Sequence, residues 1–138
     1  MAHSYGALIM TKGRTPAEVL DAIVAATRSA VSSLQVTRKQ EDHTNWNSVI
    51  LTSVLTDGTV AEQSLQVNIG DDVVETFIEL AQGTVGPEAT KGRDAMLYGT
   101  LSGDVDWTSV NEIVSYAVHH LAGLPWDQTS GFSMPSQP

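Results

Sequence analysis

The fold is decided by the stretch WNSVILTSVLTDGTVAEQSLQVNI, which runs from Trp46 to Ile69 and has the pattern of two β-strands joined by a tight turn. Val, Ile, Thr and Trp occur on both sides of the turn, as is typical of strands. The pair Asp57-Gly58 accepts the positive φ angles of a two-residue type I′ turn. Such a turn fixes the register, which predicts these opposite pairs: Thr56 with Thr59, Ile50 with Leu65, Ser48 with Val67, and Trp46 with Ile69.

Alternation along the strands divides this hairpin into two faces. The face that carries Ile50 and Leu65 is expected to lie in the core. The other face is only half polar, because Glu62, Ser64 and Gln66 share it with four apolar residues. An apolar sheet face requires cover from a helix or from another molecule. We therefore interpret these four as candidate partner-binding residues: Val49, Leu51, Leu55 and Val60.

Upstream of the hairpin the sequence predicts a strand and a long helix. Ser4–Thr11 is mostly apolar and is expected to form the first strand. A capping box begins the helix, because Thr15 can accept a hydrogen bond from the Glu18 amide while the Glu18 carboxylate reaches back. Apolar residues then recur at helical spacing as far as Leu34. Residues 35–43 are polar, as expected for an exposed strand or a loop.

Downstream of the hairpin the sequence predicts a second helix, a strand and a third helix. The second helix runs from residue 71 or 72 to Gly83, and the strand covers residues 95–101. The third helix begins around residues 106–109 and ends before Gly123. Its buried stripe is expected to contain Trp107, Val110, Ile113, Val114, Ala117 and Leu121.

The resulting order, β-α-β-β-α-β followed by a helix, is that of the split βαβ or ferredoxin-like arrangement. The sequence therefore predicts a single α+β domain of two layers over residues 1–123, with an antiparallel sheet and an extra C-terminal helix. Right-handed crossovers would place the first two helices on one face of the sheet. The third helix, or the sheet of a second copy, is expected to cover the opposite face.

Residues 124–138, LPWDQTSGFSMPSQP, are expected to form an extended C-terminal arm. The arm holds three prolines and one charge, yet it also contains Trp126 and Phe132. Large aromatic residues are rare in flexible tails. We therefore expect the arm to lie against its own domain or a neighbouring subunit, and we include both aromatic residues among the candidate partner-binding residues.

The charge of the chain is strongly negative and unevenly distributed. Its 138 residues include 7 Lys+Arg and 16 Asp+Glu, a formal net charge of −9. This charge argues against binding to nucleic acid or to an anionic membrane. Residues 57–112 alone carry eleven acids against two bases. Within them Asp71, Glu75 and Glu79 form an acidic stripe at helical spacing, a candidate surface for a basic protein partner.

The residue types and motifs that the sequence lacks narrow its chemistry and location. Without cysteine, the chain has no disulfide, zinc-ribbon, thiol-nucleophile or iron–sulfur chemistry. It contains no glycine-rich phosphate loop, no calcium loop and no paired-histidine zinc motif, so neither a cofactor nor a metal is expected. The N-terminus lacks a signal-peptide pattern and no apolar stretch reaches the length of a membrane span. These features predict a cytoplasmic protein.

Three functions from different classes fit these features, one of which is a regulatory domain that binds a small ligand through loop amides at the start of a helix. The favoured one is a non-catalytic domain that binds protein, either a second copy or a basic partner. It would act as an inhibitor of the immunity type, an adaptor or chaperone, or a structural subunit, for instance of a virion. The alternative is a small enzyme built as a dimeric α+β barrel, with acid–base residues drawn from His43, Tyr98, Tyr116 and His119.

Overall fold

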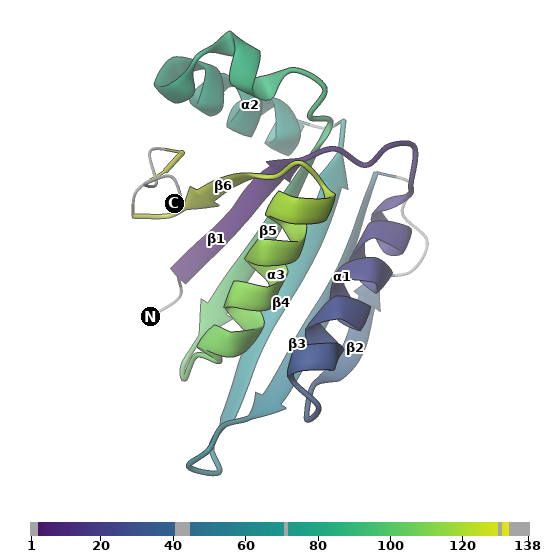
Figure 1. Cartoon of the computed structure of the whole chain (residues 1–138), viewed down its shortest axis with the longest axis vertical. Coiled ribbons are helices and arrows are strands. Elements are labelled where there is room, and N and C mark those ends of the chain that lie inside the picture. Colours follow the sequence, from purple (N-terminus) through teal and green to yellow (C-terminus); the bar gives the residue numbers. More distant parts are fainter. Residues whose placement is uncertain (1–2, 41–44, 71, 130, 133–138) are drawn as a thin grey trace.

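The computed structural model of the protein describes residues 3–40, 45–70, 72–129 and 131–132 (Figure 1). The strands are β1 His3–Ile9, β2 Gln35–Gln40, β3 Trp46–Val54, β4 Val60–Ile69, β5 Ala95–Ser102 and β6 Leu124–Asp127. The helices are α1 Pro16–Ala30, α2 Asp72–Val85 and α3 Trp107–His120, and a short 3-10 helix, η1 Pro87–Thr90, follows α2. In this part of the chain, none of the helices combines the length and the apolar character needed to cross a bilayer.

The strands form one six-stranded antiparallel sheet, which confirms the predicted α+β class. Their order, β2-β3-β4-β5-β1-β6, does not confirm the split βαβ arrangement. In that arrangement each helix joins two parallel strands with a third strand between them. Here α2 joins β4 and β5, which are antiparallel neighbours. The helix is therefore part of a long hairpin connection and not a crossover.

The helices lie on both faces of the sheet (Figure 1). α1 and α3 are side by side on one face, whereas α2 packs on the other face near one end of the strands. The expectation that the first two helices share a face and that the third covers the opposite one is therefore wrong. Because β4 and β5 are direct neighbours, α2 only has to bridge adjacent strand ends, and it does so on the face that α1 leaves open.

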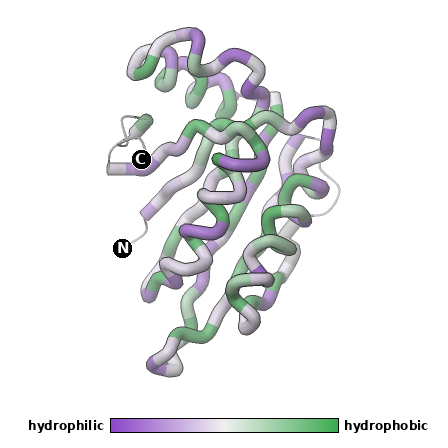
Figure 2. Tube along the Cα trace, in the orientation of Figure 1, coloured by the Kyte–Doolittle hydropathy of each residue, from purple (hydrophilic) through white to green (hydrophobic). Residues whose placement is uncertain are grey.

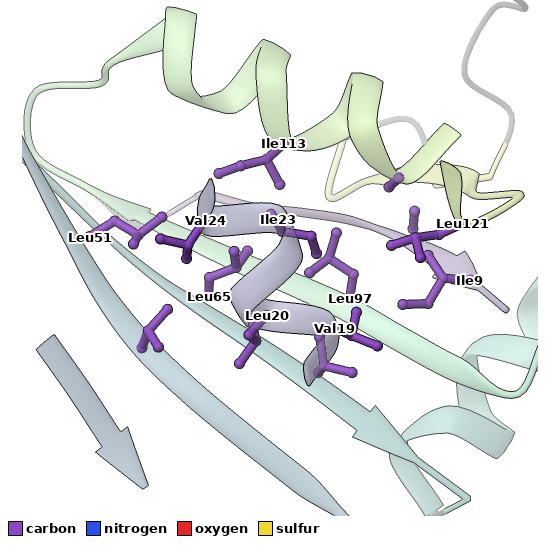
Figure 3. Packing of buried hydrophobic residues seen from close by; sticks show 14 of the residues in the cluster. Ile9, Val19, Leu20, Ile23, Val24, Leu51, Leu65, Leu97, Ile113 and Leu121 are labelled. Carbon is purple, nitrogen blue, oxygen red and sulfur yellow. The ribbon is translucent and has the colours of Figure 1, made fainter. Parts of the chain in front are cut away.

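The main hydrophobic core lies between the sheet and the α1–α3 layer. Figure 3 shows Leu20 and Ile23 of α1 in the same cluster as Leu65 of β4, Leu97 of β5 and Ile113 of α3. Burying a side chain of this size contributes about 1.5–3 kcal/mol to stability. A smaller cluster under α2 consists of Leu8, Val74, Ala81, Met96 and Phe132.

The β3–β4 hairpin has a register one residue away from the predicted one. Val54 lies opposite Val60, and the turn between them is longer than two residues. The Gly58 amide donates to the Leu55 carbonyl (2.9 Å), and the Leu55 amide donates to the Thr59 carbonyl (2.8 Å). Gly58, with φ of 87°, therefore forms a bulge after a type I turn. The tip of this hairpin is hydrophilic (Figure 2).

This shift exchanges the two faces of β3. Val49 lies opposite Leu65, and both Val49 and Leu51 are buried in the main core. Ile50 points to the opposite face, where it is half-buried. The prediction that Val49 and Leu51 lie on the face opposite the main core is therefore wrong, because a slip of one residue moves every side chain of a strand to the other side.

β1 lies between β5 and β6, and one aromatic residue connects it to β4 as well. Tyr5 lies opposite Gly99 of β5, and its hydroxyl donates to Gln63 Oε1 on β4 (2.5 Å). A Cβ atom at Gly99 would come within 2.4 Å of the Tyr5 ring, so the crossing requires glycine at this position. Burial raises the pKa of Tyr5 well above its ordinary value, which keeps the hydroxyl protonated as a donor.

The neighbours Leu51 and Ile50 provide a matched test of the register. Leu51→Glu should lower the free energy of unfolding by at least about 3 kcal/mol, because it removes a core side chain and buries an unpaired carboxylate. Ile50→Glu should lower it by about 1 kcal/mol or less, since the charge stays on the uncovered face. Urea denaturation followed by circular dichroism measures both, and the reverse ranking would support the two-residue turn.

Gly99→Ala should lower the free energy of unfolding by about 1–3 kcal/mol, because the Tyr5 ring would have to move away from β5. Gly83→Ala in α2 is the control, since an added Cβ there meets no atom of the described chain within 4 Å. Alanine is preferred over glycine inside a helix by about 0.5–1 kcal/mol, so the two melting temperatures should move in opposite directions. A Gly99→Ala protein as stable as the wild type would contradict the close crossing.

Candidate functional site

The apolar candidates from the hairpin do not form one surface. Val49 and Leu51 are 0% and 1% exposed, so neither is available to a partner. Leu55 is half-buried in the turn. Val60 is 61% exposed, opposite the equally exposed Val54. The half-apolar surface expected from the sequence is thus reduced to a valine pair near the hairpin tip, together with Ile50.

The acidic candidates lie on the solvent side of α2. Glu75 and Glu79 are exposed there, as is Asp72, whereas Asp71 lies outside the described residues. α2 itself contains no Lys or Arg. Its surface is acidic but also partly apolar, since Val73 and Leu80 are exposed there as well, and its binding of a basic partner stays a prediction.

Trp126 and Phe132 of the expected arm pack inside the domain. β6 places Trp126 on the α2 side of the sheet, where its ring stacks on Tyr98 (centroids 5.8 Å apart) and meets Phe77 edge-on (5.0 Å). Phe132 is buried and also contacts Phe77 edge-on (6.3 Å). Of the two expectations for the arm, these contacts satisfy packing against its own domain, and Leu124–Asp127 join the sheet as β6.

The acid–base candidates do not converge on a common pocket. Tyr98 belongs to the aromatic cluster under α2. Tyr116 stacks on His120 (centroids 4.7 Å apart) along α3, and His119 is exposed on the same helix. His43 lies outside the described residues. Within the described residues, no group of three or more His, Asp and Glu side chains could hold a metal ion.

A groove of about 780 Å³ runs along α3, on the side of that helix away from α1. We call it the α3–β6 groove, because α3 forms one wall and β6 the other. Its floor is the first half of β1, with His3, Tyr5 and Gly6. The lining also includes Trp126 and Phe132 of the cluster under α2, and Val85 at the end of that helix, so the groove continues around β6 toward the α2 face. The volume lies in the upper part of the range of binding sites, about 300–1,000 Å³.

α3 packs one side against the sheet and exposes two apolar residues in the groove. Toward the sheet, Ile113 and Ala117 are fully buried. On the groove side, Trp107 is 59% exposed and Val118 is 36% exposed. Between these two residues lie the exposed, polar Asn111 and the half-buried Val114, which packs against the main core. The groove side of α3 therefore offers two exposed apolar side chains, Trp107 and Val118, near its two ends.

Polar contacts fasten the β6 wall of the groove to β1. His3 Nε2 lies 3.2 Å from Asp127 Oδ2. The Gln128 amide donates to the Ser4 carbonyl (2.9 Å), and the Ser4 amide donates to Gln128 Oε1 (2.8 Å). Asp127 is the only carboxylate among the described lining residues, and none of them is Lys or Arg. The lining is therefore mainly apolar, with one carboxylate that already faces a histidine.

The part of the sheet that the helices leave uncovered is a second open surface. Ile50, Val54 and Val60 are there, but hydroxyl and carboxylate side chains surround them, such as Thr52, Glu62, Ser64 and Thr100. Interfaces depend on clustered apolar and aromatic anchors. The α3–β6 groove provides such a cluster, with an exposed indole, and is the better candidate.

The sequence pattern predicts Trp107 as part of a single buried stripe, which is wrong for this residue. The sequence itself indicates this error, because the predicted stripe is too wide. At 100° per residue, Trp107 and Ile113 point about 120° apart, too wide for one helix face on a flat sheet. β6 is harder to predict from the sequence, because a four-residue segment that includes Pro125 does not resemble a strand.

No protein-family model, curated protein or solved structure matches the chain. The interpretation of the groove therefore rests on its own geometry and chemistry.

Asp106 fixes the start of α3 and so holds one wall of the groove. Its carboxylate accepts hydrogen bonds from the Ser109 amide (3.2 Å), the Ser109 hydroxyl (2.7 Å) and the Ser53 hydroxyl of β3 (2.7 Å). Burial raises the pKa of Asp106, but the hydrogen bonds from Ser109 and Ser53 outweigh burial and hold the pKa below its usual range.

Because the native pKa of Asp106 is lowered, its contribution to stability is present above the ordinary Asp pKa of about 3.9 and is lost as the pH falls further. Asp106→Asn should lower the free energy of unfolding by about 1–2 kcal/mol at neutral pH. It should also flatten the loss of stability below about pH 4. Urea titrations at several pH values measure both effects, with the exposed Asp104→Asn as control. Parallel stability curves for wild type and Asp106→Asn would contradict this assignment.

Proposed function

We propose that the protein is a non-catalytic interaction domain that binds another protein chain in the α3–β6 groove. The observation that carries this proposal is the exposure of Trp107 and Val118 in the groove, on a helix whose sheet-facing Ile113 and Ala117 are fully buried. Tryptophan is enriched among the residues that contribute most to protein–protein binding.

The lining of the groove supports a protein partner more than a small polar substrate. Sites for small molecules combine an apolar cavity with several convergent polar groups that fix orientation. Here the carboxylate of Asp127 faces His3, while His119 and Asn111 lie on α3, the opposite wall. The enzyme alternative gains no support from the described residues, because Tyr98 is under α2 and does not share the groove with His119.

Site-specific photocrosslinking in the native cells tests this proposal. A benzophenone side chain introduced at Val118 should form covalent adducts with a bound protein, whereas the same side chain at Val54 should form few. Val54 is the matched control, since it is an exposed valine on the opposite face of the sheet. Adducts are detected by gel shift and identified by mass spectrometry.

The outcome that would overturn the proposal is the absence of adducts from Val118 in cells where the protein is folded and abundant. Adducts from Val54 alone would transfer the interface to the uncovered sheet face. Adducts between two copies of this chain through Val118 would support the groove as an interface and identify self-association.

A further inference from the structure

We propose that two turns at one end of the sheet form a binding site for a small molecule that carries a phosphate group. Both turns have the sequence Thr-Lys-Gly-Arg, at residues 11–14 and 90–93. The first follows β1 and the second precedes β5, so they lie at the same end of the sheet (Figure 1). None of these residues lines the α3–β6 groove, so this inference is independent of the proposed function.

The two tetrapeptides reverse the chain with the same hydrogen bond. In each, the arginine amide donates to the threonine carbonyl: Arg14 to Thr11 (3.2 Å) and Arg93 to Thr90 (3.1 Å). Each is therefore a β-turn with lysine and glycine at its two central positions. Among the described residues, none accepts a hydrogen bond from the amide of either glycine. Amides at the centre of a turn are well placed to bind an anion.

Asp94 and Met10 hold the two turns side by side. The Asp94 carboxylate accepts hydrogen bonds from the Thr11 amide (2.9 Å) and the Thr11 hydroxyl (2.6 Å). The Asp94 amide donates to the Ile9 carbonyl (3.0 Å). A Cβ atom at Gly92 would lie 3.1 Å from the terminal methyl group of Met10, so the second turn contacts the residue just before the first. Both turns can thus reach one ligand.

The turns concentrate positive charge on an acidic protein. They contain four of the seven Lys and Arg residues of a chain whose net charge is −9. Lys12 is exposed, and Lys91 is exposed with only a surface ion pair to Glu88 (3.4 Å). Arg14 donates from Nε to the carbonyl of its own turn (3.1 Å), and no described residue accepts from its two terminal nitrogens. These three side chains are the proposed cationic ligands.

Arg93 holds the site together and is not one of the proposed ligands. Its Nε donates to the Ala122 carbonyl (2.8 Å), and a terminal nitrogen of the guanidinium donates to the Ala89 carbonyl. Ala89 belongs to η1 and Ala122 follows α3, so Arg93 fixes the second turn to the end of α3.

The backbone of Lys12 indicates that this lysine is not present for the sake of the turn. Its φ of 55° and the 83° of Gly13 are typical of a type I′ turn, in which glycine, asparagine and aspartate are preferred. The second turn avoids this strain, because Lys91 has a φ of −59° and Gly92 one of 77°, as in a type II turn. Strained residues concentrate at binding sites, and the charge of Lys12 explains its presence.

A single phosphate group fits this arrangement better than a carboxylate or a polyanion. Phosphate has enough acceptor oxygens to meet both turns at once, whereas a carboxylate has two. Arginine also pairs well with phosphate through two parallel hydrogen bonds. A nucleic acid would extend beyond the turns and meet the net negative charge of the protein. The ligand class is therefore a phosphorylated small molecule.

The test is an NMR titration of isotope-labelled protein with inorganic phosphate at a constant ionic strength of about 0.15 M. Phosphate should shift the amide signals of Gly13 and Gly92 together, with a dissociation constant on the order of 1 mM. Acetate at the same ionic strength should leave both signals in place.

Lys12→Gly and Arg28→Gln are the matched variants. Lys12→Gly removes one cation of the site but gives the turn its preferred residue, so phosphate should bind about fivefold more weakly while the melting temperature does not fall. Arg28→Gln removes an exposed positive charge from the last turn of α1. It should change the dissociation constant by less than about twofold.

Adenosine monophosphate and O-phosphoserine then distinguish the carriers of the phosphate, and tighter binding of either one than of inorganic phosphate supports the inference. Four results would overturn it. Equal shifts with acetate would remove the preference for phosphate, and unchanged binding by Lys12→Gly would remove the site. Weaker binding of both carriers than of inorganic phosphate would reject a phosphorylated small molecule. Tighter binding of a short DNA duplex than of adenosine monophosphate would identify a polyanion surface instead.

Discussion

The position of β1 in the sheet depends on the passage of Tyr5 over Gly99. The ring fills the space that a side chain on β5 would occupy, and its hydroxyl reaches Gln63 on β4. Three adjacent strands are thereby held by one residue, and the donor is protonated at any ordinary pH. With β1 fixed, β6 has an edge on which to pair, and the floor and far wall of the α3–β6 groove follow from that pairing.

Local signals in the sequence predict local structure well. Thr15 and Glu18 form the expected capping box, with hydrogen bonds of 3.2 and 2.9 Å. All three helices occur near the predicted positions, although α2 does not end at Gly83 and continues to Val85. The hairpin register could not be predicted, because Asp57-Gly58 fits either a two-residue turn or a longer turn with a glycine bulge. The choice depends on whether Leu51 or Ile50 meets α1, which is a tertiary contact.

The candidate site could not be predicted from the sequence for the same reason, because it depends on tertiary contacts. Residues chosen for being apolar on a presumed outer face, Val49 and Leu51, lie in the core. The groove depends on the strand order, since β6 must pair with β1 before α3 has anything opposite it. The sequence does show that the predicted buried stripe of α3 is too wide to pack against the sheet alone. Which part of it stays exposed, here Trp107 and Val118, is settled by the position of α1.

The strand order also has a consequence for how the chain folds during synthesis. β1 is made first, yet both of its neighbours, β5 and β6, come from the last third of the chain. His3, for example, pairs with Leu101. Contacts so distant in sequence are slow to form. The β3–β4 hairpin can assemble early on the ribosome, while the N-terminal strand waits for most of the chain, exposing Leu8 and Ile9 to chaperones in the interval.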